Sequence, residues 1–240
     1  VRAINVNEFS DATWPDGAIA LVPADTGEEQ VANAIETVGS FDGWREAAQL
    51  LNAFPRAKLA TIASFVPPLL PILGAPSFVV EYGCSTSRGK TTAIRVAAAV
   101  WGYPEPDSGR SVIRNWDMTP VAIERMLGFL RNVPFFLDDT RRARFPEDVS
   151  DVFYAVAQGQ GRGRGSLKGS QSTKGFRTVL ISTGEQPTSA TSNKAGAKAR
   201  TLEITGNPFN DENQAKIVQR VTELAKGNYG HAGPEFVQWL

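Results

Sequence analysis

The sequence contains very little cysteine and histidine and no long, regular apolar run. Of its 240 residues, one is cysteine, Cys84, and one is histidine, His231. A single cysteine excludes an internal disulfide and a zinc centre built from several cysteines. A lone histidine predicts a structural or capping role. The longest apolar stretch, residues 61–80, contains four prolines, so it predicts neither a regular helix nor a membrane span. We therefore expect a cytoplasmic protein without a membrane partner.

The chain carries no net charge, but its charges are unevenly distributed. It has 25 basic and 25 acidic residues, and 42% of its residues are hydrophobic, which excludes a disordered, collagen-like or coiled-coil protein. Residues 1–50 hold nine acidic and two basic residues, whereas residues 158–200 hold eight basic and one acidic. Zero net charge is therefore a poor argument against a polyanionic partner.

The pattern of the chain predicts an α/β fold with a mainly parallel central sheet flanked by helices. Apolar runs predict strands at 77–82, 111–114, 134–137, 176–182 and 201–205. Helical periodicity predicts helices at 28–38, 41–54, 57–65, 90–101, 120–131, 147–158 and 211–226. We expect an acidic N-terminal segment (1–40), a helical lead-in (41–72) and a core (73–240). The start at Val1 and the apolar end indicate a piece of a longer protein.

The most informative motif lies between the first core strand and the helix that follows it. Gly89-Lys90-Thr91 matches the end of the phosphate-loop pattern G-x-x-x-x-G-K-[ST]. Cys84 stands where the first glycine of the pattern belongs, and Gly83 lies one position earlier. One loop residue must then adopt an unusual backbone conformation. The alternative is a Gly/Ser loop that merely joins a strand to a helix.

This loop has the residue types that binding ATP and Mg²⁺ requires. Its backbone N–H groups can surround the phosphates, Lys90 can neutralise phosphate charge, and the Thr91 hydroxyl can bind Mg²⁺. Thr92 supplies a second hydroxyl. The candidate nucleotide-binding residues are Ser85, Thr86, Ser87, Arg88, Gly89, Lys90, Thr91 and Thr92.

Two further strand ends supply polar groups of the kind that nucleotide hydrolysis needs. The strand at 134–137 leads into Asp138 and Asp139, which we assign to the metal and to the attacking water. The strand at 176–182 leads into Thr183, which, like Ser182, is a candidate sensor of the γ-phosphate, and Glu185 is a candidate to support Asp139. The alternative is that these residues are ordinary strand-end turn formers.

A glycine-rich basic segment follows the helix at 147–158. Glycine permits close approach of a backbone, and cations suit the phosphates of a nucleic acid strand. The alternative is a solvated flexible loop. Arg162, Arg164 and Arg200 are candidates for an arginine finger, which acts in a partner's active site and so implies an oligomer. The candidate nucleic-acid-binding residues are Arg162, Arg164, Lys168 and Lys174.

Several motifs together resemble the domain of unknown function 927 family over most of residues 40–240. They are Trp44, Pro67-Pro68-Leu69-Leu70, Ser87–Thr92 with Arg95–Gly102, Leu137-Asp138-Asp139, Tyr154, Gly159 with Gly161-Arg162, Ser182–Glu185 and Gly230–Pro234. The resemblance implies an AAA+-like P-loop ATPase, the helicase domain of phage, plasmid and mobile-element primase-helicases. It implies Lys90 and Thr91 as nucleotide ligands, Asp138 as the metal residue and Thr183 or Ser182 as the sensor. The sequence departs from the family's expected residues at Cys84 and Asp139, in place of Gly and Glu.

Three functions follow as hypotheses. The first is a DNA-translocating ATPase that acts in DNA replication on single-stranded or forked DNA as a hexameric ring. The second is a P-loop kinase for a small molecule, for which the Gly/Arg segment would serve as a lid. The third is a DNA-binding or assembly module that does not hydrolyse ATP, which the residues at 84 and 139 would permit.

Overall fold

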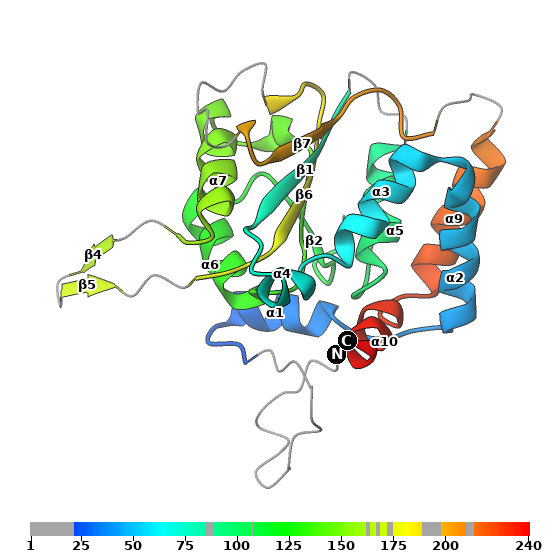
Figure 1. Ribbon diagram of the computed structural model, residues 1–240, viewed down its shortest axis with the longest axis horizontal. Coiled ribbons are helices and arrows are strands. Elements are labelled where there is room, and N and C mark those ends of the chain that lie inside the picture. The colour runs from blue at the N-terminus through cyan, green and yellow to red at the C-terminus, as the bar shows by residue number, and fades with distance from the viewer. Residues whose placement is uncertain are drawn as a thin grey trace, which may run out of the picture. The chain divides into compact units, whose positions relative to one another are not determined.

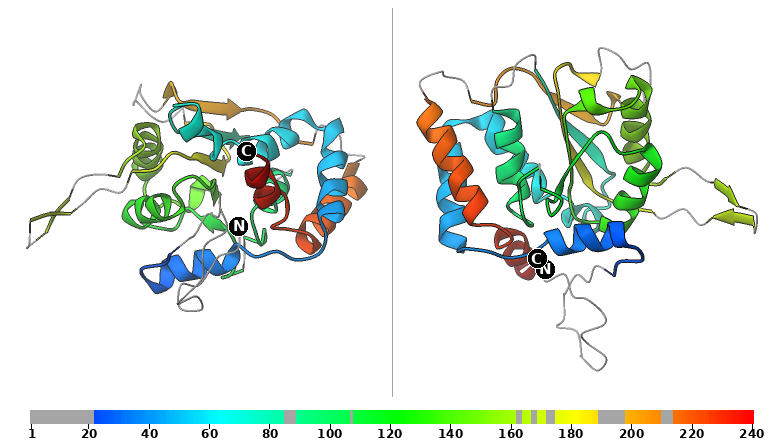
Figure 2. Two further views of the ribbon diagram at one scale, coloured as in Figure 1. Left: turned by 60° about the horizontal axis from the view of Figure 1, so that its bottom comes forward. Right: turned by 180° about the vertical axis from the view of Figure 1, so that it is seen from behind.

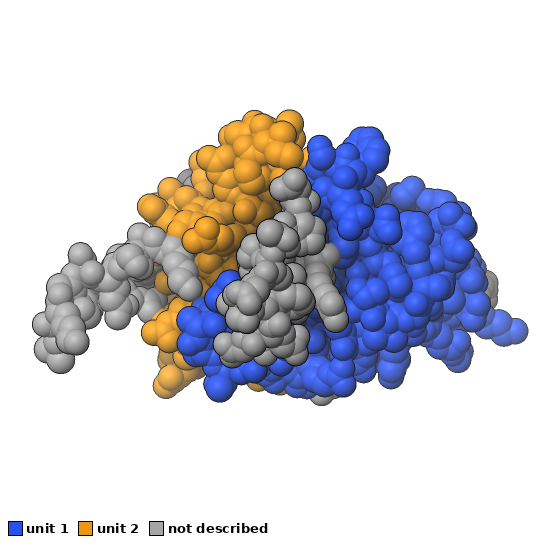
Figure 3. Space-filling model, turned by 90° about the horizontal axis from the view of Figure 1, so that it is seen from below, with its two compact units in different colours: residues 1–65, 88–114, 207–240 blue, residues 66–87, 115–206 orange. Residues whose placement is uncertain are grey.

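The described part of the chain forms two compact units, each assembled from separate stretches of sequence. The computed structural model describes residues 22–84, 89–106, 108–161, 164–166, 169–171, 175–188, 198–209 and 214–240. Unit 1 comprises residues 1–65, 88–114 and 207–240, and unit 2 comprises residues 66–87 and 115–206 (Figure 3). The predicted division at residues 40 and 72 stays a prediction.

A five-stranded sheet has the order β2-β3-β6-β1-β7, and its strands β1, β3, β6 and β7 lie in unit 2 (Figure 1). The pairings β3–β6, β6–β1 and β1–β7 are all parallel, as the alternation of strands and helices predicted. Most residues of β1, β3 and β6 are buried, as expected of strands covered on both faces. The strands are β1 (Phe78–Gly83), β2 (Ile113–Asn115), β3 (Phe135–Asp138), β6 (Val179–Gly184) and β7 (Thr201–Ile204).

The helices α6 (Pro120–Leu130) and α7 (Pro146–Gln158) lie beside this sheet in unit 2 (Figure 1). The predicted start of α6 is confirmed: the Thr119 side chain caps the helix by accepting a hydrogen bond from the Ala122 N–H, 3.3 Å away. Trp116 packs against Phe153 of α7, with ring centroids 5.9 Å apart. These contacts fix α7 beside the strand ends that carry the candidate site.

Unit 1 is helical, and its helices pack around buried aromatic rings. Helix α3 packs on α5, and both α2 and α5 pack on α9 (Figure 2). The Trp101 indole N–H donates to the Ser64 carbonyl at 2.9 Å, and a Cβ at Gly233 would lie 2.6 Å from the Trp101 ring. The helices are α1 (Thr26–Ala34), α2 (Phe41–Leu50), α3 (Pro55–Ser64), α5 (Lys90–Ala98), α9 (Ala215–Gly227) and α10 (Ala232–Trp239), with the 3₁₀ turn η2 (Leu51–Ala53).

The structure differs from the sequence predictions at several elements. Helix α1 ends four residues before the end of the helix predicted at 28–38. A single turn, α4 (Leu69–Ile72), forms within the proline-rich stretch, where no regular helix was expected. β6 begins later and ends later than predicted, so Thr183 lies inside the strand. Helix α10, whose Gly233 packs against the Trp101 ring, was not predicted. The basic segment contains a hairpin, which is described below. No helix among the described residues is long and apolar enough to cross a membrane.

Candidate functional site

The candidate site of unit 2 lies at the carboxyl ends of its parallel strands. Strand β6 lies between β1, which leads into the phosphate-loop motif, and β3, which ends at Asp138. Since parallel strands end at the same edge of a sheet, Thr183 and Asp138 come together there. Polar groups from separate segments therefore meet where α/β sheets commonly bind ligands.

Thr183 joins the two acidic residues at this edge. Its side chain is 2% exposed, and its hydroxyl donates to Oδ1 of Asp138 at 2.5 Å. The same hydroxyl oxygen accepts a hydrogen bond from the backbone N–H of Asp139 at 2.9 Å. One hydroxyl thus orients the Asp138 carboxylate and the start of the segment that carries Asp139.

Ser182, the other sensor candidate, faces away from the carboxylates. It is fully buried, and its hydroxyl oxygen accepts a hydrogen bond from the Trp116 indole N–H at 3.0 Å. Neighbouring residues of a strand point to opposite faces, so Ser182 and Thr183 could not both face the acidic pair. Of the two candidates, Thr183 is the one that bonds to the acidic pair, and its sensor role stays a prediction.

Asp139 has a backbone conformation that explains its residue type. Its φ is 60°, one of two values in the left-handed region among the described non-glycine residues. Asp and Asn tolerate this region better than longer side chains do. Its carboxylate accepts a hydrogen bond from the Arg141 N–H at 3.2 Å, capping the 3₁₀ turn η3 (Thr140–Arg142). An aspartate in place of the glutamate that the family resemblance implied thus suits this turn.

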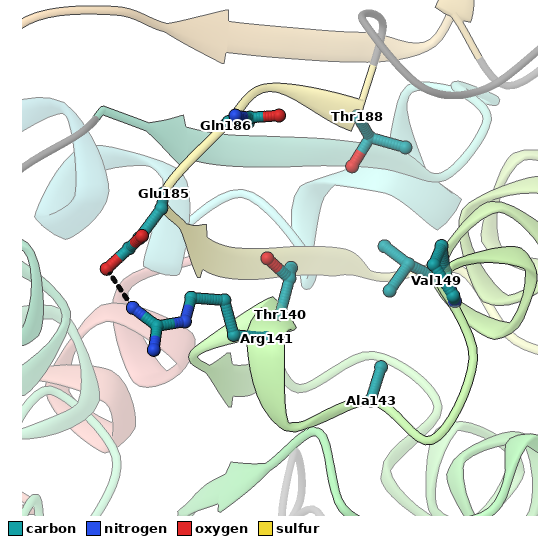
Figure 4. Close-up of a pocket in the computed structure, with 8 residues that line it drawn as sticks. Thr140, Arg141, Ala143, Val149, Glu185, Gln186 and Thr188 are labelled. Carbon is teal, nitrogen blue, oxygen red and sulfur yellow. Dashed lines mark hydrogen bonds and ion pairs between the residues drawn. The ribbon is translucent and has the colours of Figure 1, made fainter.

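A cavity of about 370 Å³ opens next to Thr140, the residue that follows Asp139 (Figure 4). Glu185 and Arg141 form an ion pair on its wall. Glu185 is therefore held in place by Arg141, a residue that the sequence did not single out. The lining residues are Thr140, Arg141, Ala143, Pro146, Val149, Glu185, Gln186 and Thr188.

The end of β1 is packed closely against the segment that follows β6. A Cβ at Gly83 would lie 2.7 Å from Pro187 Cα, and the Cys84 N–H donates to the Gly184 carbonyl at 3.3 Å. Cys84 is buried and its φ is not in the left-handed region. Ser85, Thr86, Ser87 and Arg88 lie outside the described residues.

Gly89, the last glycine of the phosphate-loop motif, lies in unit 1 and has a left-handed backbone conformation. The unusual conformation expected to make up for the motif's missing first glycine stays a prediction. Gly89 has a φ of 86° and precedes α5, in which Lys90 is the first residue. A Cβ there would lie 2.4 Å from the ring of Phe209, which packs on Phe54 with centroids 4.9 Å apart. Lys90 and Thr92 are 9% and 7% exposed. Phe209 was not recognisable as part of this motif, because it lies 120 residues downstream.

The glycine-rich basic segment contains an antiparallel hairpin rather than only a loop. Strand β4 (Arg164–Ser166) pairs with β5 (Gly169–Gln171), and a bridge between Gln160 and Gly175 continues the same register towards the core of unit 2. Arg164 belongs to β4. Arg162, Lys168 and Lys174 lie outside the described residues.

Arg200, a candidate for an arginine finger, lies directly before β7. Its guanidinium donates to the carbonyl of Ala157 near the end of α7. Its own carbonyl accepts a hydrogen bond from the Val79 N–H at 2.9 Å. Within this chain Arg200 therefore links α7 to the sheet, and a role in a neighbouring subunit stays a prediction.

Comparisons with known proteins agree with this architecture. The chain is similar to a solved structure described as "SCCmec type IV Cch - active helicase", with a TM-score of 0.70 and 22% identity. The match covers 97% of this chain and 41% of that one, so the chain spans less than half of the structure it matches. Similarity at this identity shows a shared fold. No curated protein matches the chain.

A family model also matches the sequence. The model described as "Domain of unknown function (DUF927)" matches residues 11–175, more than half of the chain. The matched range contains the phosphate-loop motif, both acidic residues at the end of β3, and the basic hairpin. The chain belongs to the DUF927 family.

Proposed function

We propose that the chain is the ATP-hydrolysing core of a DNA-translocating protein, a helicase of a phage or mobile-element replication system. The observation that supports it best is the hydrogen bonding of Thr183 to both Asp138 and Asp139, on the strand next to the one leading into the phosphate-loop motif. A hydroxyl between paired carboxylates at this edge suits a γ-phosphate sensor. The fold shared with Cch, which is described as an active helicase, agrees with this assignment.

The phosphate-loop motif indicates which residues would bind the nucleotide. The backbone of residues 83–89 would surround the phosphates, with Ser85, Thr86, Ser87 and Arg88 contributing to the loop. Lys90 would neutralise phosphate charge, and Thr92 would support the first turn of α5.

The residues fit a magnesium ion. Mg²⁺ prefers oxygen ligands and is usually held by one or two protein groups plus phosphate oxygens, and the Thr91 hydroxyl and Asp138 carboxylate are of this kind. Thr183 orients that carboxylate. When bound, the ion neutralises charge on the phosphates during transfer.

Asp139 and Glu185 act on the attacking water in this proposal. Asp139 orients it and accepts its proton, while Glu185, held by Arg141, supports that role from the cavity wall. Arg200 would contact the nucleotide of a neighbouring subunit, which requires a ring such as a hexamer.

The basic hairpin is the proposed contact with single-stranded or forked DNA. The glycines of the basic segment would let its backbone approach a DNA strand closely, and its cations Arg162, Arg164, Lys168 and Lys174 suit phosphates. A hairpin is a better platform than an unpaired loop, because β4–β5 pairing holds the two arms in one register.

ATP turnover with and without single-stranded DNA tests the proposal. The wild-type chain should hydrolyse ATP faster with DNA, and Lys90→Ala should remove turnover, whereas Lys226→Ala, at an exposed cation of α9, should not. Unchanged turnover in Lys90→Ala contradicts the assignment. Phosphoryl transfer to a small acceptor without DNA stimulation supports a kinase instead. DNA binding without turnover in any oligomeric state supports an assembly module.

A further inference from the structure

A buried carboxylate lies within the apolar strand that leads into the phosphate-loop motif. Glu81 is fully buried in the middle of β1, between Val80 and Tyr82. Burying a carboxylate is costly unless hydrogen bonds replace its lost water. Among apolar neighbours, this residue therefore needs specific partners.

One residue supplies hydrogen bonds to both oxygens of this carboxylate. The Thr188 backbone N–H donates to Oε2 of Glu81 at 2.9 Å, and the Thr188 hydroxyl donates to Oε1 at 2.5 Å. Thr188 is itself 7% exposed and lies five residues beyond Thr183. The backbone and the side chain of one residue, Thr188, therefore both donate hydrogen bonds to this carboxylate.

The carboxylate also lies in register with polar groups on both neighbouring strands. Glu81 is opposite Ser182 of β6 and Glu203 of β7. Burial raises the pKa of Glu81 to about 7, the bonds from Thr188 oppose this rise, and the charge of Glu203 adds to it. Burial of the Glu81 carboxylate is thus energetically unfavourable, and the hydrogen bonds from Thr188 offset the loss of its hydrating water.

Two further contacts attach the same segment to β1. The Cys84 N–H bonds to the Gly184 carbonyl, and Gly83 packs against Pro187 so closely that a Cβ would not fit. Residues 184–188 are therefore held against β1 at three points. This segment carries Glu185 and Gln186, which line the same cavity as Thr140, the residue after Asp139.

We propose that Glu81 is a positioning residue, which holds Thr188 and so keeps the segment 184–188, with Glu185 and its wall of the cavity, in place beside β1. Its consequence for catalysis rests on the proposed function. Glu81 acts through Thr188 and contacts no reacting atom. Replacing it should therefore change the rate of the chemical step more than the binding of ATP.

Amide hydrogen exchange tests, independently of enzymatic activity, whether Glu81 holds residues 184–188 in place. In Glu81→Leu, exchange in a peptide covering residues 184–188 should be faster by about tenfold or more, the effect of losing hydrogen bonds to a charged group. Glu81→Gln should restore slow exchange, because an amide can accept from the Thr188 N–H and donate to its hydroxyl oxygen. Glu223→Leu, at an exposed position of α9, is the matched control. Unchanged exchange in a folded Glu81→Leu overturns the proposal.

A second pair of variants keeps the proposal testable if Glu81→Leu does not fold. Thr188→Val keeps the shape of the side chain and its backbone N–H but loses the hydroxyl, so exchange should rise, whereas Thr188→Ser should behave as wild type. Equal exchange in Thr188→Val and wild type overturns the proposal in the same way.

Steady-state kinetics separate this inference from the proposed function. Glu81→Leu should lower kcat by about tenfold with KM within about twofold of wild type, and Glu81→Gln should recover most of kcat. A rise in KM at constant kcat overturns the positioning role. Absence of turnover in wild type instead contradicts the proposed function, and the exchange experiment then still decides the role of Glu81.

Discussion

The hydroxyl of Thr183 donates a hydrogen bond to Oδ1 of Asp138, 2.5 Å away, and joins the ends of two neighbouring parallel strands. The two residues are 45 positions apart in the chain. The same hydroxyl accepts from the Asp139 N–H, so a single side chain sets the positions of both acidic residues. This relationship is the structural centre of the proposed hydrolytic site.

Thr183→Val tests the importance of this hydroxyl. Valine keeps the shape of threonine but removes the hydroxyl that donates to Asp138 and that accepts from the Asp139 N–H. A hydrogen bond to a charged group contributes about 1.5–3 kcal/mol, so we expect ATP turnover to fall roughly 10- to 150-fold. Steady-state turnover measures this, and Thr183→Ser, which keeps the hydroxyl, should stay within a few-fold of wild type. Equal rates for Thr183→Val and wild type would contradict the sensor role.

Asp139→Asn separates the charge of this residue from its backbone conformation. Asparagine tolerates a φ of 60° as aspartate does, so the free energy of unfolding should change by less than about 0.5 kcal/mol. Loss of the carboxylate should lower kcat by about 10²- to 10⁴-fold if Asp139 accepts a proton. Denaturant unfolding and single-turnover hydrolysis check the two parts. Asp139→Glu should instead destabilise the fold, and a gain in both stability and rate from it would refute this assignment.

Gly89→Ala tests why the phosphate-loop motif needs glycine at this position. Alanine would combine an unfavourable φ of 86° with a Cβ 2.4 Å from the Phe209 ring. We expect a loss of about 2–5 kcal/mol in the free energy of unfolding. Gly74→Ala is the matched control, because Gly74 has a φ of 62° and nothing within 4 Å of the added Cβ, so it should cost only about 1–2 kcal/mol. Equal losses at both positions would show that the Phe209 ring is irrelevant.

Glu81→Gln should change the pH dependence of stability. The pKa of Glu81 is raised from 4.5 to about 7, so between these values the folded state binds more protons than the unfolded state. The contribution of this carboxyl to the free energy of unfolding is therefore fully present below about pH 4.5, and it is lost as the pH rises through 7. As the pH rises from 5 to 8, the free energy of unfolding of Glu81→Gln should increase relative to that of wild type by on the order of 2–3 kcal/mol. Urea unfolding at both pH values measures it, and a constant difference between the two proteins would contradict the raised pKa.

Glutamine at all four candidate DNA-binding positions of the basic segment should weaken DNA binding in a salt-dependent way. For single-stranded DNA, each phosphate contact contributes about 0.7 to the slope of log affinity against log salt concentration, so the slope should become shallower by up to about 3. Fluorescence anisotropy between about 50 and 200 mM salt measures it. Glutamine at Arg45, Arg56, Arg220 and Lys226, four cations of unit 1, controls for total charge. An equal loss of slope in both variants would show a non-specific charge effect. The four positions of the basic segment are Arg162, Arg164, Lys168 and Lys174.

Local pattern in the sequence determined most elements and the type of the fold. Apolar runs placed β1, β3 and β7 to within one or two residues, and the Thr119-Pro120 pair predicted the start of α6. These features depend on neighbours in the chain, so they can be inferred without tertiary contacts. The Gly-Lys-Thr motif and the Asp138-Asp139 pair were recognisable for the same reason.

Contacts between residues far apart in the chain decided the rest. The sequence left Ser182 and Thr183 open as sensors, and the choice depends on which face of β6 each occupies. Burial of Glu81 was visible only as a charge within an apolar strand, while its partner Thr188 lies 107 residues away. The sequence by itself thus determined which residues stand at each strand end. Only the tertiary structure decided which of them meet, because strand register and packing arise from long-range contacts.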